Sequence, residues 1–96
     1  MNHEQVHRGL TDPQIQAALG GRVRSYREAA GLTQQDLAQR AGLTVLTIHK
    51  AEQGANFTAR TLLRILRALG RLEQLDAFLP PVQESPLNLL EQQDGR

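Results

Sequence analysis

The side chains that perform covalent chemistry in most enzymes are scarce in this sequence of 96 residues. It contains no cysteine, and its two serines, Ser25 and Ser85, lie in no recognisable catalytic context. A nuclease would need several metal-binding carboxylates close together. The carboxylates in the central part of the chain instead lie near expected helix ends, where they act as caps and ion-pair partners: Glu28, Asp36 and Glu52. The sequence therefore predicts no catalytic residues and a protein that is not an enzyme.

Two histidines near the N-terminus are spaced as metal ligands would be on a helix. His3 and His7 are four residues apart, but a zinc site needs at least a third protein ligand, and none is apparent. The surrounding segment 1–10 is polar and has no helical period, so we expect a flexible arm. We therefore expect neither a metal nor any other cofactor.

Charge is distributed unevenly along the chain. The formal net charge is +1 overall, but residues 1–70 carry +4 and residues 71–96 carry −3. A basic body suits a polyanionic partner, whereas an acidic tail is repelled by phosphates and should lie away from them. An ordinary mixture of solvated charges explains the same numbers equally well.

The composition is that of one globular domain. Hydrophobic residues make up 40% of the chain, and a length near 100 residues allows one modest core. No apolar run approaches the length of a membrane span, and the first ten residues lack the apolar stretch of a signal peptide. Together with the lack of cysteine, this predicts a soluble, cytoplasmic protein without a membrane partner.

Apolar periodicity and capping residues predict an all-α fold of about five helices. Glycine and proline separate the periodic segments, and threonines precede three of them. Gly20-Gly21 falls inside the first segment, where it should bend the helix or delay its start to about Leu19. The expected helices lie at about 12–30, 33–41, 44–53, 58–69 and 71–79, and a short helix after Ser85-Pro86 is also considered.

The second and third of these helices carry a distinctive steric pattern. Two short helices that cross steeply need a small residue at the crossing, a residue that tolerates positive φ at the turn, and a branched apolar side chain beneath the second helix. Ala38, Gly42 and Ile48 occupy these places in the window from Gln34 to Gln53. The remaining buried positions of this window are Leu37, Ala41, Leu43 and Ala51. The pattern predicts a helix-turn-helix, a motif used to bind DNA.

The chain resembles the family of phage Cro and repressor-type helix-turn-helix regulators, also called the XRE type. The resemblance covers residues 19–70 and rests on the segments LGGRVR (19–24), GLTQQDLA (31–38), AGLT (41–44), EQG (52–54) and LLRIL (62–66). It implies a compact bundle like the DNA-binding domain of lambda repressor, followed by a short C-terminal extension. The segment from Phe78 to Leu90 also resembles a subgroup of short bacterial regulators that includes HipB-like antitoxins.

The resemblance also implies roles for individual residues. The second helix of the motif is expected to enter the major groove of double-stranded DNA with its N-terminal residues on the base edges. Phosphate contacts are expected at two helix starts. They correspond to Gln34 and Gln35 on the helix expected over 33–41, and to Asn56 and Arg60 near the start of the helix expected over 58–69. Arg27 and Glu52 correspond to a structural ion pair. The expected reading residues are Thr44, Val45, Leu46, Thr47, His49 and Lys50.

Two positions depart from the family pattern. Family members commonly have polar residues where Val45 and Leu46 stand, so direct hydrogen-bond readout is thinner and an A·T-containing site is favoured. Alternatively, one of these side chains faces a protein partner. Phe57 stands where the family often has proline, which indicates a dimer or core contact instead.

The expected organisation is a flexible arm over 1–10, a DNA-binding domain over 11–70, and a C-terminal helix with an acidic tail over 71–96. We expect a transcriptional regulator that binds its operator as a homodimer, since one short recognition helix makes few contacts. The last segment either dimerises, folds back on its own core, or binds a protein. In the alternative function, the protein is an antitoxin that neutralises a toxin through this tail and autoregulates its operon.

Overall fold

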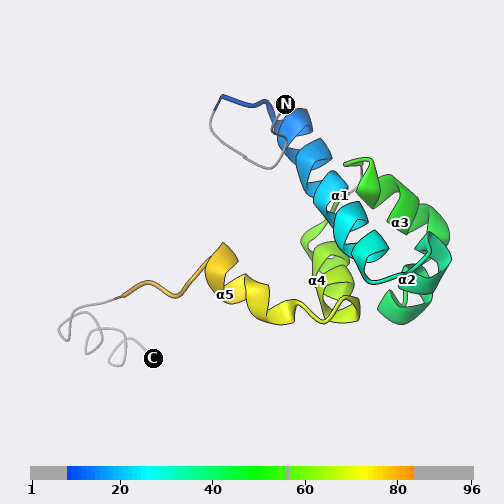
Figure 1. Ribbon diagram of the computed structural model, residues 1–96. Helices are drawn as coiled ribbons and strands as arrows, with labels where there is room; N and C mark the ends of the chain where they lie inside the picture. The colour runs from blue at the N-terminus through cyan, green and yellow to red at the C-terminus, as the bar shows by residue number, and fades with distance from the viewer. Residues whose placement is uncertain (1–8, 56, 84–96) are drawn as a thin grey trace.

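In a computed structural model of the protein, residues 9–55 and 57–83 are described, and every regular element among them is helical. The α-helices α1 (Asp12–Ala29), α2 (Gln34–Ala41), α3 (Val45–Glu52) and α4 (Ala59–Ala68) form the body. A 3-10 turn, η1 (Leu72–Gln74), and the short α5 (Leu75–Phe78) follow. Figure 1 shows α2 and α3 side by side at one end of the body and α5 projecting from the other. The all-α prediction is confirmed.

Threonine side chains begin each of the four long helices. In α1, the Thr11 hydroxyl accepts from the Gln14 amide, and the Gln14 side chain accepts from the Thr11 amide in return. Thr33 and Asp36 form the same reciprocal pair at the start of α2. Such caps satisfy amides that have no partner inside the helix, so the sequence marks the helix starts strongly. Thr44 and Thr58 cap α3 and α4.

The first helix differs from expectation, because it runs without interruption through Gly20-Gly21. The reason at Gly20 is a close approach between helices. A Cβ atom at Gly20 would lie 2.5 Å from the carbonyl oxygen of Ala51 and 2.6 Å from that of Glu52, at the end of α3. Gly54 approaches α1 in the same way, because its Cβ would lie 2.7 Å from the amide nitrogen of Ala17. The expected bend is therefore wrong, and Gly20 serves helix packing.

The core lies where α1, α2, α3 and α4 meet. Leu37, Ile48 and Ile65 are fully buried and come from three different helices, and Val23 adds a contact from α1. Phe57 packs against this core, so of its two expected roles the structure shows the core contact. The broad apolar stripe of α4 is covered only in part, because Leu63 remains 40% exposed and Leu62, Leu66 and Leu69 are half-buried.

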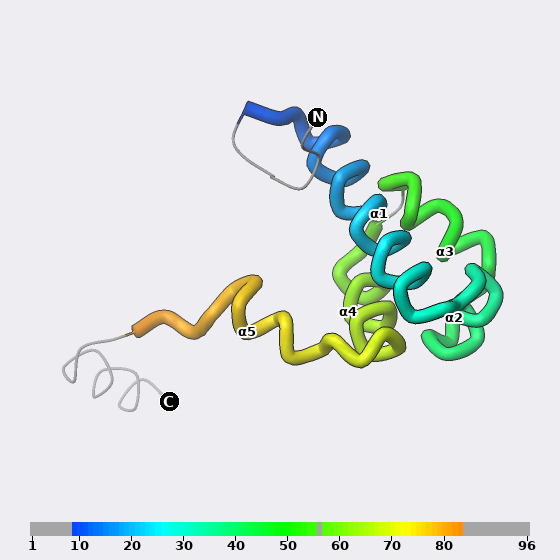
Figure 2. Tube along the Cα trace, viewed as in Figure 1, coloured from blue at the N-terminus to red at the C-terminus, as the bar shows by residue number. Residues whose placement is uncertain are grey.

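The segment after α4 does not form the single helix expected over 71–79. Gly70, at φ 72°, ends α4, and the chain then makes one 3-10 turn and one α-helical turn before Pro80. Neither Arg71 nor Gln74 provides a side-chain cap, and isolated helices this short are marginal without one. The tube in Figure 2 shows this segment leading away from the body. The helix considered after Ser85-Pro86 and the arm over 1–8 lie outside the described residues.

None of the described helices has the length and apolar character that would be needed to cross a membrane. Within 9–55 and 57–83, no group of three or more acidic or histidine side chains is arranged to hold a metal ion.

Candidate nucleic-acid interface

The turn between α2 and α3 has the geometry that the motif requires. Gly42 adopts the left-handed conformation, with φ 68° and ψ 34°, and the Leu43 amide donates to the Ala38 carbonyl at 2.9 Å. Ala38 is 3% exposed, which allows α2 and α3 to approach each other closely. Ile48 lies beneath α3 and is completely buried. The Ala38, Gly42 and Ile48 pattern is thus realised as a helix-turn-helix.

Burial of one face of α3 determines what its opposite face presents to solvent. Ile48 and Ala51 are fully buried, and at 100° per residue Leu46 lies on the opposite side of the helix. Leu46 is accordingly 59% exposed, and Val45 is 44% exposed. Two adjacent large apolar side chains are thus held at the surface of the helix that follows the turn, where a bound molecule can contact them.

The polar residues of α3 divide between its two ends. Thr44 caps the helix, and its hydroxyl lies 2.9 Å from that of Thr47, so one of these two hydroxyls donates to the other and the acceptor keeps its own O–H donor. His49 and Lys50 lie in the last turn, where His49 is exposed and Lys50 is half-buried. Leu46 is one helical turn before both, on the same surface. The outward face of α3 therefore combines two apolar side chains, a mutually bonded hydroxyl pair and a basic end.

A buried ion pair sets the position of α3 relative to α1. Arg27 donates from Nε to Glu52 Oε2 at 2.6 Å and from Nη2 to Glu52 Oε1 at 3.1 Å, and its Nη1 donates to the Leu32 carbonyl at 2.8 Å. The two side chains are only 10% and 4% exposed. The hydrogen bonds that Arg27 donates to Glu52 raise the pKa of Arg27 above its usual value. Arg27 and Glu52, paired by resemblance in the sequence, are thus directly joined.

Gln34 belongs to the same network. Its side-chain amide donates to Glu52 Oε1 at 3.0 Å, so the first residue of α2 is tied to the last residue of α3. Gln35, its neighbour, is exposed and has no side-chain hydrogen bond among the described residues. Gln34 therefore acts as a brace in the free protein, and the exposed side chain of Gln35 is available to a ligand at the same helix start.

One contact at the turn was not anticipated from the sequence. Arg64 of α4 donates from Nη1 to the Gly42 carbonyl at 3.1 Å and so supports the turn from behind. Its position in the apolar pattern of α4 gave no signal for this role, because the contact depends on how α4 packs against α2. Of the expected phosphate contacts, Arg60 is exposed in the first turn of α4, and Asn56 lies outside the described residues.

Comparison with known proteins places this geometry in a family. Residues 18–78 match a family model described as a helix-turn-helix domain. The chain is also 43% identical over 58 residues to a protein from the archaeon Methanothermobacter thermautotrophicus that is named an uncharacterized HTH-type transcriptional regulator; the match covers 59% of this chain and 84% of that protein. With more than half of the chain matched and the turn, core and ion pair in place, the chain belongs to the helix-turn-helix family of DNA-binding transcriptional regulators, as a member of the Cro/repressor or XRE type.

Proposed function

We propose that this protein is a sequence-specific regulator whose two copies bind a pseudo-palindromic operator, each placing the N-terminal half of α3 in the major groove. The observation that carries this proposal is the exposed face of α3, where Leu46 and Val45 point to solvent while Ile48 and Ala51 anchor the helix. In dimeric regulators of this kind, the two half-sites are about one DNA turn, roughly 34 Å, apart.

The readout we propose is mainly apolar. Leu46 and Val45 can contact the 5-methyl group of thymine, which is the only apolar group that a base pair presents in the major groove. The Thr44 and Thr47 hydroxyls share one hydrogen bond, so together they offer a base one remaining O–H donor. We therefore expect half-sites that contain A·T pairs. The other interpretation of the exposed pair, a protein contact, predicts no change in base preference when Leu46 is altered.

Phosphate contacts would come from residues around α3. We assign them to Lys50 and Arg60 as cations, and to Gln35 with the free amides at the start of α2. Gln34 donates one Nε2 hydrogen to Glu52, and its second Nε2 hydrogen can still be donated to a phosphate. These contacts position the protein on DNA without reading its sequence.

The proposal is tested by selecting bound sequences from a random DNA pool with the wild-type protein and with Leu46→Ala. We expect a two-fold symmetric motif from the wild type, and a changed preference at one base position per half-site from the variant. An unaltered motif from Leu46→Ala would remove Leu46 from the reading surface.

A second measurement separates phosphate contacts from base contacts. Lys50→Ala and Arg60→Ala should weaken binding to all DNA sequences and lower the slope of log affinity against log salt by about one unit per lost phosphate contact. Arg67→Ala, at the other end of α4 from Arg60, removes the same charge and should leave the slope nearly unchanged. Equal slopes in all four proteins would contradict the phosphate assignments.

The alternative function is that of an antitoxin that binds a toxin through its C-terminal tail and uses DNA binding for autoregulation. We place it second, because the exposed face of α3 favours DNA recognition and no described residue is assigned to toxin binding. Co-purification of a toxin encoded beside this gene, and loss of that binding on removal of residues 84–96, would favour it.

A further inference from the structure

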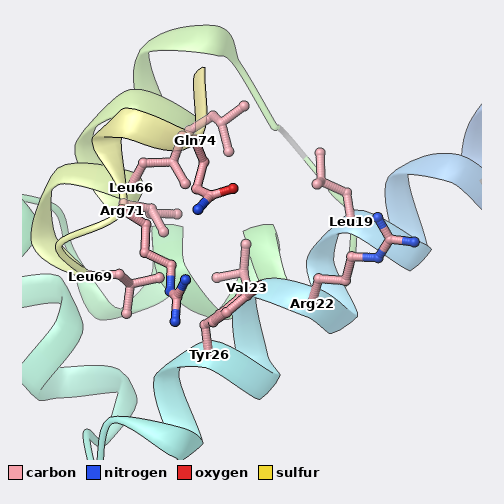
Figure 3. Close-up of a pocket in the computed structure, with 10 residues that line it drawn as sticks. Leu19, Arg22, Val23, Tyr26, Leu66, Leu69, Arg71 and Gln74 are labelled. Carbon is pink, nitrogen blue, oxygen red and sulfur yellow. The ribbon is translucent and has the colours of Figure 1, made fainter. Parts of the chain in front are cut away.

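Two apolar surfaces remain uncovered on the side of the body away from α3. The first is a groove between α1 and α4, with a volume of about 180 Å³, which we call the α1–α4 groove. Figure 3 shows side chains of α1 on one side of it and side chains of α4 and the following turn on the other. The residues of the groove that matter here are Leu19, Arg22, Tyr26, Leu62, Leu66 and Arg71.

The second uncovered surface is the segment 75–83, which we call the C-terminal arm. Phe78 is 68% exposed, Leu79 is 78% exposed and Val82 is 84% exposed. α5 packs mainly against η1, the turn directly before it. Pro80 and Pro81 prevent α5 from continuing and hold the rest of the arm extended. The arm thus presents three large apolar side chains within residues 78–82 that the body of the same copy does not cover.

Charges on the two surfaces are opposite and unpaired within one copy. Arg22 lines the groove and Asp76 lies on the arm, and among the described residues neither has an ion-pair partner within 4 Å. Arg71 lies over the Tyr26 ring, 4.2 Å from its centre, so its guanidinium forms part of the groove wall. The groove carries two arginines between apolar walls, and the arm carries one aspartate beside exposed apolar side chains, so the two surfaces are complementary in charge and polarity, although in a single copy they do not cover each other.

We propose that the C-terminal arm of a second copy of this chain binds in the α1–α4 groove, and that the arm of the first copy binds in the groove of the second. This inference rests on the proposed homodimer and specifies its contact surface. A two-fold axis makes every contact twice, so two arms and two grooves contribute to one interface. Specific, stable interfaces bury about 1,200–2,000 Å² in total, and the reciprocal exchange doubles the area that one arm buries in one groove. Because α3 lies at the opposite end of the body, both recognition helices stay accessible (Figure 1).

The test is a complementation experiment on the full chain with two variants that fail separately. Leu66→Lys places a positive charge in the groove, and Phe78→Glu places a negative charge on the arm. We expect the wild type to sediment as a dimer and each variant alone as a monomer. When the variants are mixed, one groove and one arm remain intact and the other pair becomes a lysine–glutamate pair, so we expect the dimer to return.

Matched controls carry the same charge changes outside the two surfaces. Leu63→Lys lies on α4 but does not line the groove, and Gln39→Glu is exposed on α2, outside both the groove and the arm. Both should remain dimers. Circular dichroism shows whether each variant is folded, and recovery of the dimer on mixing shows the same for the monomeric variants. A variant pair that stays monomeric on mixing would overturn the exchange.

Two further measurements test whether the C-terminal arm of a second copy binds in the groove. Removal of residues 84–96 should leave the dimer intact; loss of the dimer would overturn our assignment and give the groove to that segment. A monomeric wild type at about 100 µM, far above the micromolar range typical of weak association, would also overturn it. If the wild type is a monomer that still selects a DNA sequence, the arm exchange is wrong and DNA recognition stands. If it is an arm-exchanged dimer that selects no DNA sequence, the proposed function is wrong and the arm exchange stands.

Discussion

Single residues in this protein act mainly by holding α3 in place. Glu52 accepts hydrogen bonds from both Arg27 and Gln34, and so links α1, α2 and α3 through one carboxylate. Because the side chains of Arg27 and Glu52 are almost entirely buried, each charge has lost its contacts with water and is stabilised by the other charge instead. The chain offers an exposed pair for comparison, Arg24 and Glu28, which lie 3.2 Å apart on the surface of α1.

The two ion pairs should differ strongly in their contribution to stability. Replacing Glu52 with Gln leaves Arg27 buried without a counter-charge, and we expect a loss of about 3–5 kcal/mol of unfolding free energy. Replacing Glu28 with Gln in the exposed pair should cost about 0–1 kcal/mol. Urea denaturation of both variants measures this. Similar losses in the two would mean that burial does not distinguish the pairs.

A single carboxylate at the start of α2 links stability to pH. Asp36 accepts the Thr33 amide at 3.0 Å, and this backbone hydrogen bond, followed by the one with the Thr33 hydroxyl, holds the pKa of Asp36 below its ordinary value of 3.8. A depressed carboxylate pKa means that the stabilisation is fully present above the unfolded-state pKa and disappears as the pH falls through the folded-state pKa.

Asp36→Ala should therefore be less stable than the wild type at neutral pH, and the gap between the two should narrow as the pH falls below about 4. The other carboxylates titrate in both proteins, so their effects cancel in the difference. Urea midpoints measured from pH 7 down to the acid limit of folding show this trend. A gap that is constant over the whole range would show that the charge of Asp36 does not matter.

At the scale of elements, adjacent glycines in α1 have different roles. Gly20 lies against the last carbonyls of α3, where a Cβ would approach within 2.5 Å of Ala51 O. Gly21 has open space around its Cβ position. Both lie inside a helix, where glycine costs roughly 0.5–1 kcal/mol relative to alanine. Only at Gly20 is this cost offset, because the missing side chain allows α1 and α3 to pack closely.

The same substitution at the two positions should have opposite effects. Gly20→Ala forces α3 away from α1 and should destabilise by about 1–3 kcal/mol, as overpacking does. Gly21→Ala should stabilise by about 0.5–1 kcal/mol, because it removes the conformational cost without a clash. Thermal unfolding of both variants tests the pair. Stabilisation by both would contradict the close approach.

At the scale of the molecule, the body separates its two outward surfaces. The helix-turn-helix lies at one end, and the C-terminal arm leads away from the other (Figure 1). The α1–α4 groove is lined by residues of α1, α4 and the turn that leads into the arm. The arm leaves large apolar side chains in solvent, which a small monomeric protein seldom does in one place. The whole molecule is therefore arranged for two partners at once, DNA at α3 and, by our proposal, a second copy at the groove.

Coupling between dimerisation and folding should be visible in unfolding experiments. A partner that binds only the native state raises its apparent stability with concentration, so the unfolding temperature of the wild type should rise by several degrees over about a hundredfold increase in protein concentration. Phe78→Glu should unfold at the same temperature at every concentration. A wild-type transition independent of concentration would contradict a dimer that dissociates on unfolding.

Local interactions were readable from the sequence, because their partners are neighbours along the chain. The threonine caps, the left-handed Gly42 and the buried Ile48 depend on residues within a few positions of each other, and all were predicted. The boundaries of the four long helices followed from the same signals. The resemblance to XRE-type regulators named the Arg27 and Glu52 pair, and the structure gives its atoms and burial.

Only the tertiary structure decided the features that depend on approach between distant segments. The sequence marked Gly20 as a weak point of a helix, but packing against α3 makes it a contact point. The contact of Arg64 with Gly42 likewise had no local signal, because the two residues are 22 positions apart. The division of 71–79 into two short turns has a local cause, the lack of a capping side chain at Arg71 and Gln74, but the apolar spacing predicted one helix there. The sequence by itself determined the four long helices and which face of each is apolar; the three-dimensional packing decided how much of those faces is covered, because burial depends on surfaces that the chain brings together only on folding.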